Sequence, residues 1–408
     1  MNIQKIITSQ LYTVSVYCRQ MAGAIIILLI ARYLSVHDFG LFSSYKSIAV
    51  FCLLFANLDY DLYILVSSKA NKNEVRLKIS LFLLNTFFII FMVSLGSLLF
   101  NLENHVLFIL VLLRTFFDTT FFCLILPYFQ ATKKFNTIAK INILYGFTVS
   151  GIAIYSFMNK LSLVKFLLLN ICAGIINFLQ CSYFSKINYL LALTKIKRFF
   201  GMLDRTIWSY IGSSITSYIY TQITALYVAM FLSKEQAALF FAAFTISSIT
   251  TLFAAAQVQK ILPEMINKNT KEHIKIIKKN CLIMGGVFTL ILVSFIFGGK
   301  ILLKLLYAKD YYMNASTILV ILTLSSAIVG LGRIFGNYIA VINRQSIKVR
   351  IKIETSIISV AGLLCLHKLG IIGAALAVLI SSCYNTARYI LFSNQMIKLH
   401  LIEENRNE

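Results

Sequence analysis

Five cationic side chains lie inside apolar runs of this sequence, where a charge needs a compensating partner. They are Arg19, Lys46, Arg114, Arg333 and Arg388. A charge at the centre of a bilayer costs about 2.5–3.5 kcal/mol on insertion scales, so a protein partner or an anionic ligand must offset it. A guanidinium presents a planar fork of donors that matches the oxygens of a phosphate. These residue types therefore predict the binding of an anionic group.

Arg19 belongs to a polar stripe together with Thr8, Tyr12 and Ser15. The spacing of i, i+4, i+7 and i+11 places all four on one face of a helix. A polar face in a membrane span should look at protein or water rather than at lipid. We expect this face to line a substrate cavity in which Arg19 meets a phosphate. A structural ion pair or a hydrogen bond between helices is the alternative.

The other charges near apolar runs allow more than one reading. Arg114 and Asp118 are one helical turn apart, so they either neutralise each other as a buried pair or lose that partner to a substrate or coupling ion. Arg333 either lines the inner mouth or extends to the membrane surface. Lys46 and Arg388 lie close enough to span ends to extend to the surface.

Two acids, Asp59 and Asp61, lie near the end of the second apolar run. Being two residues apart, they point to different faces of a helix. One of them could receive a coupling proton or Na⁺, and nothing in the sequence selects which.

The composition is that of a membrane protein. Of the 408 residues, 59% are apolar and 13% are charged, whereas soluble domains carry about 25% charged residues. The net charge of +23 reflects basic segments beside a membrane rather than nucleic-acid binding. The eight cysteines form no C-x-x-C pair, so we expect neither a zinc site nor a redox motif. No phosphate-loop, protease or kinase motif is present, and we expect no enzymatic activity and no bound cofactor or metal.

Twelve apolar runs are long enough to span a bilayer. They cover residues 10–31, 41–66, 79–100, 106–128, 141–158, 163–183, 208–231, 237–260, 281–298, 313–339, 351–367 and 370–393. Of the 38 Lys and Arg residues, 25 fall in alternate gaps and at the termini, and eight fall in the opposite gaps. Because basic segments resist translocation, both termini should be cytoplasmic. The predicted fold is an all-α polytopic membrane protein.

An internal repeat divides the chain into two halves. The segment 31–42 matches 229–240 at an offset of 198, and a weaker echo sets 128–141 against 338–351. The offset places Tyr210, Ser213 and Ser217 on Tyr12, Ser15 and Arg19.

Six spans separate the halves, so both halves should share one topology, although chance similarity of apolar segments is the alternative. We expect a cavity lined by spans 1, 2, 7 and 8. The expected organisation is a six-helix lobe (1–185), a cytoplasmic linker (186–205), a second six-helix lobe (206–394) and a cytoplasmic tail (395–408).

The turn Ala31 to Phe42 resembles a signature of the polysaccharide-exporter branch of the multidrug/oligosaccharidyl-lipid/polysaccharide flippase superfamily. The matching residues are Ala31, Arg32, Leu34, Asp38, Phe39 and Gly40. Residues 128–134 and 57–61 are similar to two further motifs of that branch, except that Tyr60 stands where Gly is common. Within the branch the chain is most similar to Wzx-type O-antigen flippases.

This resemblance implies a transporter of the bacterial inner membrane with no catalytic residues. Its substrate would be an undecaprenyl-pyrophosphate-linked oligosaccharide, moved from the cytoplasmic to the periplasmic leaflet by alternating access. Its partners would be membrane lipids and other polysaccharide-assembly proteins.

Three alternatives remain. A drug or cation antiporter of the same superfamily would favour acids over cations within its spans. A lipid II flippase often has two further spans. A membrane polysaccharide polymerase or glycosyltransferase usually carries catalytic carboxylates on a long outer loop, and the outer gaps here are short.

Overall fold

A computed structural model of the chain shows helices in every regular element that it describes. Contacts divide the chain into two compact units, Met1–Ile215 and Thr216–Glu408. The described residues are 3–57, 72–97, 103–120, 125, 128–129, 132, 134–186, 216, 219–220, 222–265, 269–342 and 344–407.

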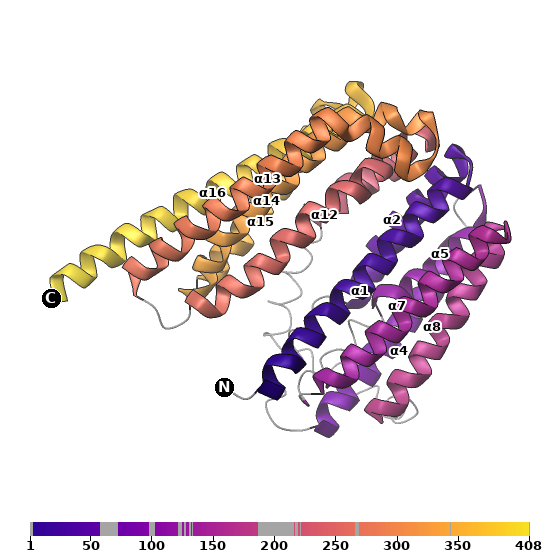
Figure 1. The fold of residues 1–408 in the computed structure, drawn as a ribbon, viewed down its shortest axis with the longest axis horizontal. Coiled ribbons are helices and arrows are strands. Elements are labelled where there is room, and N and C mark those ends of the chain that lie inside the picture. The colour runs from indigo at the N-terminus through magenta and orange to yellow at the C-terminus, as the bar shows by residue number, and fades with distance from the viewer. Residues whose placement is uncertain are drawn as a thin grey trace. The chain divides into compact units, whose positions relative to one another are not determined.

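Long helices form the first unit. They are α1 (Ile3–Tyr33), α2 (Val36–Asn57), α4 (Lys72–Ser97), α5 (His105–Thr115) with its π-helical continuation η1 (Phe116–Thr120), α7 (Phe135–Met158) and α8 (Leu163–Ser185). Side chains cap α2, α5 and α8, since Ser35, Asn104 and Ser162 each accept from the backbone N–H three residues on. Within this unit α1 packs along α7, α2 packs against α4 and α5, and α8 contacts both α5 and α7 (Figure 1).

The second unit is built around α14, which contacts α12, α13 and α16 (Figure 1). Its elements are the helix Gln222–Phe231, α12 (Lys234–Met265), α13 (Thr270–Tyr307), the 3-10 turn η2 (Asp310–Ala315), α14 (Ser316–Val341), α15 (Gln345–Cys365), the 3-10 turn η3 (His367–Leu369) and α16 (Gly370–Asn407). Its core includes Ala254, Met284, Phe288, Ile334 and Tyr338.

Among the described residues, five helical stretches are long and apolar enough to cross a membrane. They are Phe135–Met158, Leu163–Ser185, Thr270–Tyr307, Asp310–Ile339 and His367–Ile402. The twelve spans and the cytoplasmic termini stay predictions. Several helices extend beyond the predicted spans; for example, α13 already begins at Thr270 and α16 continues through the residues assigned to the tail.

The first repeated segment forms the same turn in both units. The hydroxyl of Ser35 accepts from Asp38 N at 3.0 Å, and that of Ser233 accepts from Gln236 N at 3.3 Å. The carbonyls of the two serines accept from the backbone N–H groups of Phe39 and Ala237. Each pair of partners differs by the offset of 198 residues, so the sequence repeat corresponds to one N-capped turn made twice.

The weaker echo is also a repeated turn. Lys134 N donates to Phe129 O at 2.8 Å, and Arg344 N donates to Ile339 O at 3.1 Å. Lys134 and Arg344 share a backbone conformation, with φ of −87° and −100° and ψ of 51° and 47°. These partners differ by 210 residues. The turn before α7 is therefore equivalent to the turn before α15.

A glycine at the start of α16 allows a close backbone approach. A Cβ on Gly373 would lie 2.1 Å from the carbonyl oxygen of Leu366. We expect Gly373→Ala to lower the free energy of unfolding by about 1–3 kcal/mol, since the backbone must shift to admit the methyl group. The control is Gly151→Ala on α7, where a Cβ meets nothing within 4 Å and alanine favours the helix. Equal thermal stability of the two purified variants would contradict this packing argument.

Candidate functional site

The guanidinium of Arg19 joins α1 to the π-helix and to α7. One terminal nitrogen, Nη2, donates to the backbone oxygen of Asp118 at 2.8 Å. The other, Nη1, donates to Asn142 Oδ1 at 3.4 Å, and Asn142 Nδ2 in turn contacts the hydroxyl of Ser15 at 3.5 Å. The guanidinium also lies over the ring of Tyr145, 4.5 Å from its centroid. Two residues of the predicted stripe, Ser15 and Arg19, are therefore joined through α7.

Asp118 is the acid at the centre of these contacts. Its carboxylate accepts a short hydrogen bond from the Tyr145 hydroxyl and pairs with Arg114, whose Nε lies 3.4 Å from Oδ2. Asp118 lies in η1, where the helix widens to a π-helical pattern. Single π-helical turns alter the regular backbone ladder and are frequent at functional sites. Here the backbone oxygen of the π-helical acid accepts from Arg19.

Arg114 is the enclosed cation of the group. Its side chain is 6% exposed, whereas that of Asp118 is 27% exposed. The guanidinium carbon lies 5.7 Å from the centroid of the Phe42 ring and 5.6 Å from that of Phe166, distances at which an aromatic face attracts a cation. The pair predicted from the i, i+4 spacing is present as an ion contact, although Nε makes no hydrogen bond to any described residue.

Lys46 also belongs to this group, because it lies close enough to Arg114 and Asp118 to interact with both electrostatically. That Lys46 extends to the membrane surface stays a prediction. Among the described residues, three cations, Arg19, Lys46 and Arg114, thus lie near one acid, Asp118. We call these four residues the N-terminal charge cluster.

The second unit has no equivalent of this cluster in its matching helices. At the repeat offset of 198, Ser217 stands for Arg19 and Phe244 stands for Lys46. At the offset of 210, residues 324–328 of α14 match the stretch from Arg114 to Asp118 and hold no charged side chain.

Several predicted site residues lie outside the described part of the chain. This is true of the side chains of Thr8 and Tyr12, and of Tyr210, Ser213, Ser217, Asp59 and Asp61. The expectation that the two polar stripes face each other stays a prediction.

The structure places Arg333 in α14, half-buried and within electrostatic range of Tyr220 and Tyr389. Among the described residues it forms no ion pair. Its assignment to the inner mouth of a cavity stays a prediction.

Sequence reasoning missed one acid in the second unit. Glu354 lies in α15, within the eleventh predicted span, and binds Arg388 on α16 with Nε to Oε2 at 3.1 Å. Glu354 also pairs with Arg350 and accepts from the Tyr384 hydroxyl at 2.8 Å. That Arg388 also extends to the membrane surface stays a prediction. The sequence feature that could have revealed Glu354 is its i, i+4 spacing from Arg350.

Sequence reasoning also missed Asn142 and Tyr145 on α7. Both are polar residues within an apolar run, and their spacing of three places them on one helix face. That spacing is the signal by which they could have been found.

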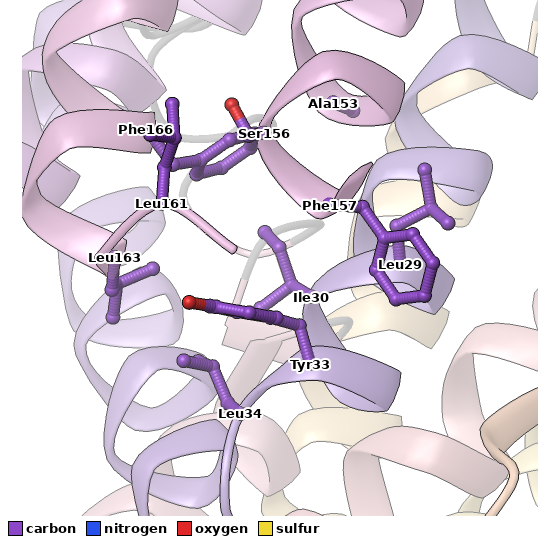
Figure 2. Close-up of a pocket in the computed structure, with 10 residues that line it drawn as sticks. All are labelled: Leu29, Ile30, Tyr33, Leu34, Ala153, Ser156, Phe157, Leu161, Leu163 and Phe166. Atoms are coloured by element: carbon purple, nitrogen blue, oxygen red, sulfur yellow. The ribbon is translucent and has the colours of Figure 1, made fainter. Parts of the chain in front are cut away.

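A small pocket lies at the other end of α1, between α1, α7 and α8 (Figure 2). Its volume of about 20 Å³ is enough for one water molecule. The lining is apolar apart from Tyr33 and Ser156, and the buried Ser156 hydroxyl has no hydrogen-bond partner among the described residues. The pocket is too small for an organic substrate, and an ordered water fits it better.

No group of three or more His, Cys, Asp or Glu side chains that could hold a metal ion occurs in the part of the chain that the structure describes. The cysteines at 18, 52, 172, 181, 281, 365 and 383 are free thiols. The charged residues therefore form ion pairs and hydrogen bonds with one another rather than a metal-ligand set. The chemistry that the cluster offers is binding of an anion by fixed cations.

Solved structures resemble this chain over nearly its whole length. The lipid II flippase MurJ in an inward closed conformation matches with a TM-score of 0.70 and 15% identity, covering 96% of this chain and 91% of that one. A multidrug resistance MATE family transporter of the MOP superfamily, facing inward, matches with a TM-score of 0.67 and 11% identity, covering 94% and 95%. This chain has the MOP transporter fold.

A third solved structure with this fold is a MOP superfamily transporter from Pyrococcus furiosus. Its binding pocket is described as having reverse polarity, which suggests a different function for that protein. It matches with a TM-score of 0.61 and 12% identity, covering 96% of this chain and 95% of that one. No protein-family model matches the sequence, and no curated protein matches it either. At these identities the likeness shows the MOP fold alone.

Proposed function

We propose that this protein is a flippase for a lipid-linked saccharide with an anionic headgroup. The substrate class is an undecaprenyl-pyrophosphate-linked O-antigen repeat unit, moved from the cytoplasmic to the periplasmic leaflet of a bacterial inner membrane by alternating access. The observation that carries the proposal is the N-terminal charge cluster. Among the described residues it brings three cations close to one acid, and the matching positions of the second half of the sequence hold no charged side chain.

The cluster suits a pyrophosphate because a phosphate oxygen can replace the contacts that Asp118 makes to the guanidinium groups of Arg19 and Arg114. Arginine binds phosphate through two parallel hydrogen bonds, so the contact has a defined geometry in addition to its charge attraction. Arg19 is the more accessible of the two arginines, since Arg114 is enclosed by aromatic rings.

A drug or cation antiporter is the second candidate, because the MATE fold matches nearly as well as the flippase fold. A cationic drug would be repelled by a site with excess positive charge, and the acids that would attract it are outnumbered here. Glu354 adds one acid to this comparison, but its charge is already paired with Arg350 and Arg388. The cluster therefore favours an anionic passenger.

The deciding experiment deletes the gene and follows lipid-linked repeat units in each leaflet of the inner membrane. We expect repeat units to accumulate on the cytoplasmic side and periplasmic addition to stop, with recovery when the wild-type gene is restored. Normal appearance of repeat units on the periplasmic side would overturn the proposal. Lost efflux of a cationic dye with normal repeat-unit movement would support the antiporter instead.

The proposed direction of transport depends on the orientation of α7, which a pair of cysteines can measure. Asn136 and Asn159 are exposed at opposite ends of this helix. In a chain whose eight cysteines are replaced by serine, we expect a membrane-impermeant maleimide to label Asn159→Cys in intact spheroplasts and Asn136→Cys only after permeabilisation. The reverse pattern would place the basic segments outside.

A further inference from the structure

The lysines that precede the ninth predicted span lie on a helix rather than in a loop. Helix α13 begins at Thr270 and is continuous to Tyr307. Its start is fixed by Asn269, whose side chain accepts from the Glu272 backbone N–H at 2.9 Å. The lysines at 271, 275, 278 and 279 therefore have defined positions on a helix surface.

These four lysines share one face of α13, which we call the basic stripe. Lys271, Lys275, Lys278 and Lys279 are linked by steps of three or four residues, and all four are exposed. The opposite face is buried and includes His273. Its Nε2 lies 2.8 Å from Met265 O, and its ring packs edge-on against Tyr338. These contacts fix the rotation of the helix, so the stripe points away from the rest of its unit.

The basic stripe continues into an apolar stripe along the same helix. Leu282, Leu290, Val293, Phe297, Ile301 and Leu305 follow along the same side of the helix at steps of three, four or eight residues, and all are exposed. Only 11% of the apolar window of α13 is buried, against 39–50% in the other four helices able to cross a membrane. A helix face this apolar and this exposed is suited to lipid. The lysines therefore look in the same direction as the lipid-facing side chains.

The spacing of charges along α13 places the basic stripe at headgroup depth. The stretch from Asn280 to Gly299 holds 20 residues without a charge and is followed by Lys300. At about 1.5 Å per residue this stretch spans about 30 Å, which is the thickness of the hydrocarbon core. When it fills the hydrocarbon, Lys279 and Lys300 reach opposite headgroup layers.

We propose that the basic stripe binds the phosphate groups of anionic phospholipids in the leaflet at that end of α13. The positive-inside distribution predicts this leaflet to be cytoplasmic. Clusters of four or more basic residues beside a membrane helix attract anionic headgroups. The positive-inside rule depends on how many basic residues lie on one side of the membrane, and it does not require them to share one helix face. The alignment of all four lysines with the lipid-facing stripe is what a lipid site requires.

The test measures phospholipid binding to delipidated full-length protein by native mass spectrometry. A fourfold Lys→Gln variant at 271, 275, 278 and 279 should bind phosphatidylglycerol at least tenfold more weakly, with zwitterionic phosphatidylcholine unchanged. The control replaces the exposed Lys134, Lys140, Lys186 and Lys398, which lie on other helices or at their ends, and should keep phosphatidylglycerol binding within about twofold. A fourfold Lys→Arg variant of the stripe should bind normally, and its folding can be compared directly.

Two results would overturn the proposal. One is unchanged phosphatidylglycerol binding in the Lys→Gln variant. The other is an equal loss in the control variant, which would mean that total charge matters rather than this face. The binding measurement does not depend on transport, so a failure of the proposed transport function would leave this result unaffected.

Discussion

Replacing Arg19 with alanine is expected to reduce transport of the lipid-linked substrate by about 30-fold or more. Truncating one partner of a desolvated charged contact costs about 2–5 kcal/mol, and 2 kcal/mol corresponds to about a 30-fold change in affinity. Arg19 uses both terminal nitrogens, one toward Asp118 and one toward Asn142, while its plane lies over Tyr145. A lysine cannot make two directed contacts from one plane. Arg19→Lys should therefore also be impaired, although it keeps the charge.

The measurement for Arg19 is recovery of periplasmic repeat units in the deletion strain, corrected for the amount of protein in the membrane. Arg350→Ala is a matched control, because it also removes an arginine that pairs with an acid, but on an exposed surface. We expect that control to support normal transport. Normal transport by both Arg19→Ala and Arg19→Lys would remove Arg19 from the site.

The second large effect is on stability. Asp118→Asn should lower the free energy of unfolding by about 3–5 kcal/mol, because it leaves enclosed Arg114 without its counter-charge. Adding Arg114→Gln should recover part of this loss, since it removes the uncompensated charge. A thermal-unfolding double-mutant cycle in detergent measures the coupling between the two residues, which we expect to be about 1–3 kcal/mol.

The control for this cycle is an ion pair at the protein surface. Lys304 Nζ and Asp310 Oδ1 are only 2.9 Å apart, yet the side chains are 60% and 77% exposed. Asp310→Asn should cost less than about 1 kcal/mol, because solvent screens an exposed pair. Additive effects of Arg114→Gln and Asp118→Asn would show that the buried pair is not coupled, contrary to the structure.

Periodicity and charge spacing predicted much of this architecture. The pairing of Arg114 with Asp118 followed from a spacing that holds in any helix, and both repeated turns were found from a handful of matching residues. These features involve residues that are close together along the chain, so the spacing of residues in the sequence is enough to predict them. The spans were predicted from apolar runs, and a helix can extend beyond its apolar run, as α13 does at Thr270.

The partners of the charged residues could not be predicted in the same way. Lys46 and Arg388 lie near the ends of apolar runs, and that position alone suggested contact with the membrane surface. Their actual neighbours are on other helices: Asp118 lies 72 positions from Lys46, and Glu354 lies 34 positions from Arg388. Such contacts depend on which helix faces which, and spacing along one helix carries no information on that. The π-helical turn at Asp118 was unpredictable for a related reason, since no residue type signals it.

The repeated turns also have a consequence for the ancestry of the chain. Ser35 and Ser233 cap equivalent helices, as Lys134 and Arg344 begin equivalent helices, with matching backbone hydrogen bonds. Duplication of one ancestral half accounts for this agreement more simply than two independent origins. The offset grows from 198 to 210 between the two turns, so the halves have since diverged by a net 12 residues in length. After such a duplication, the two halves differ in the charges that surround Asp118, which the N-terminal half alone now carries.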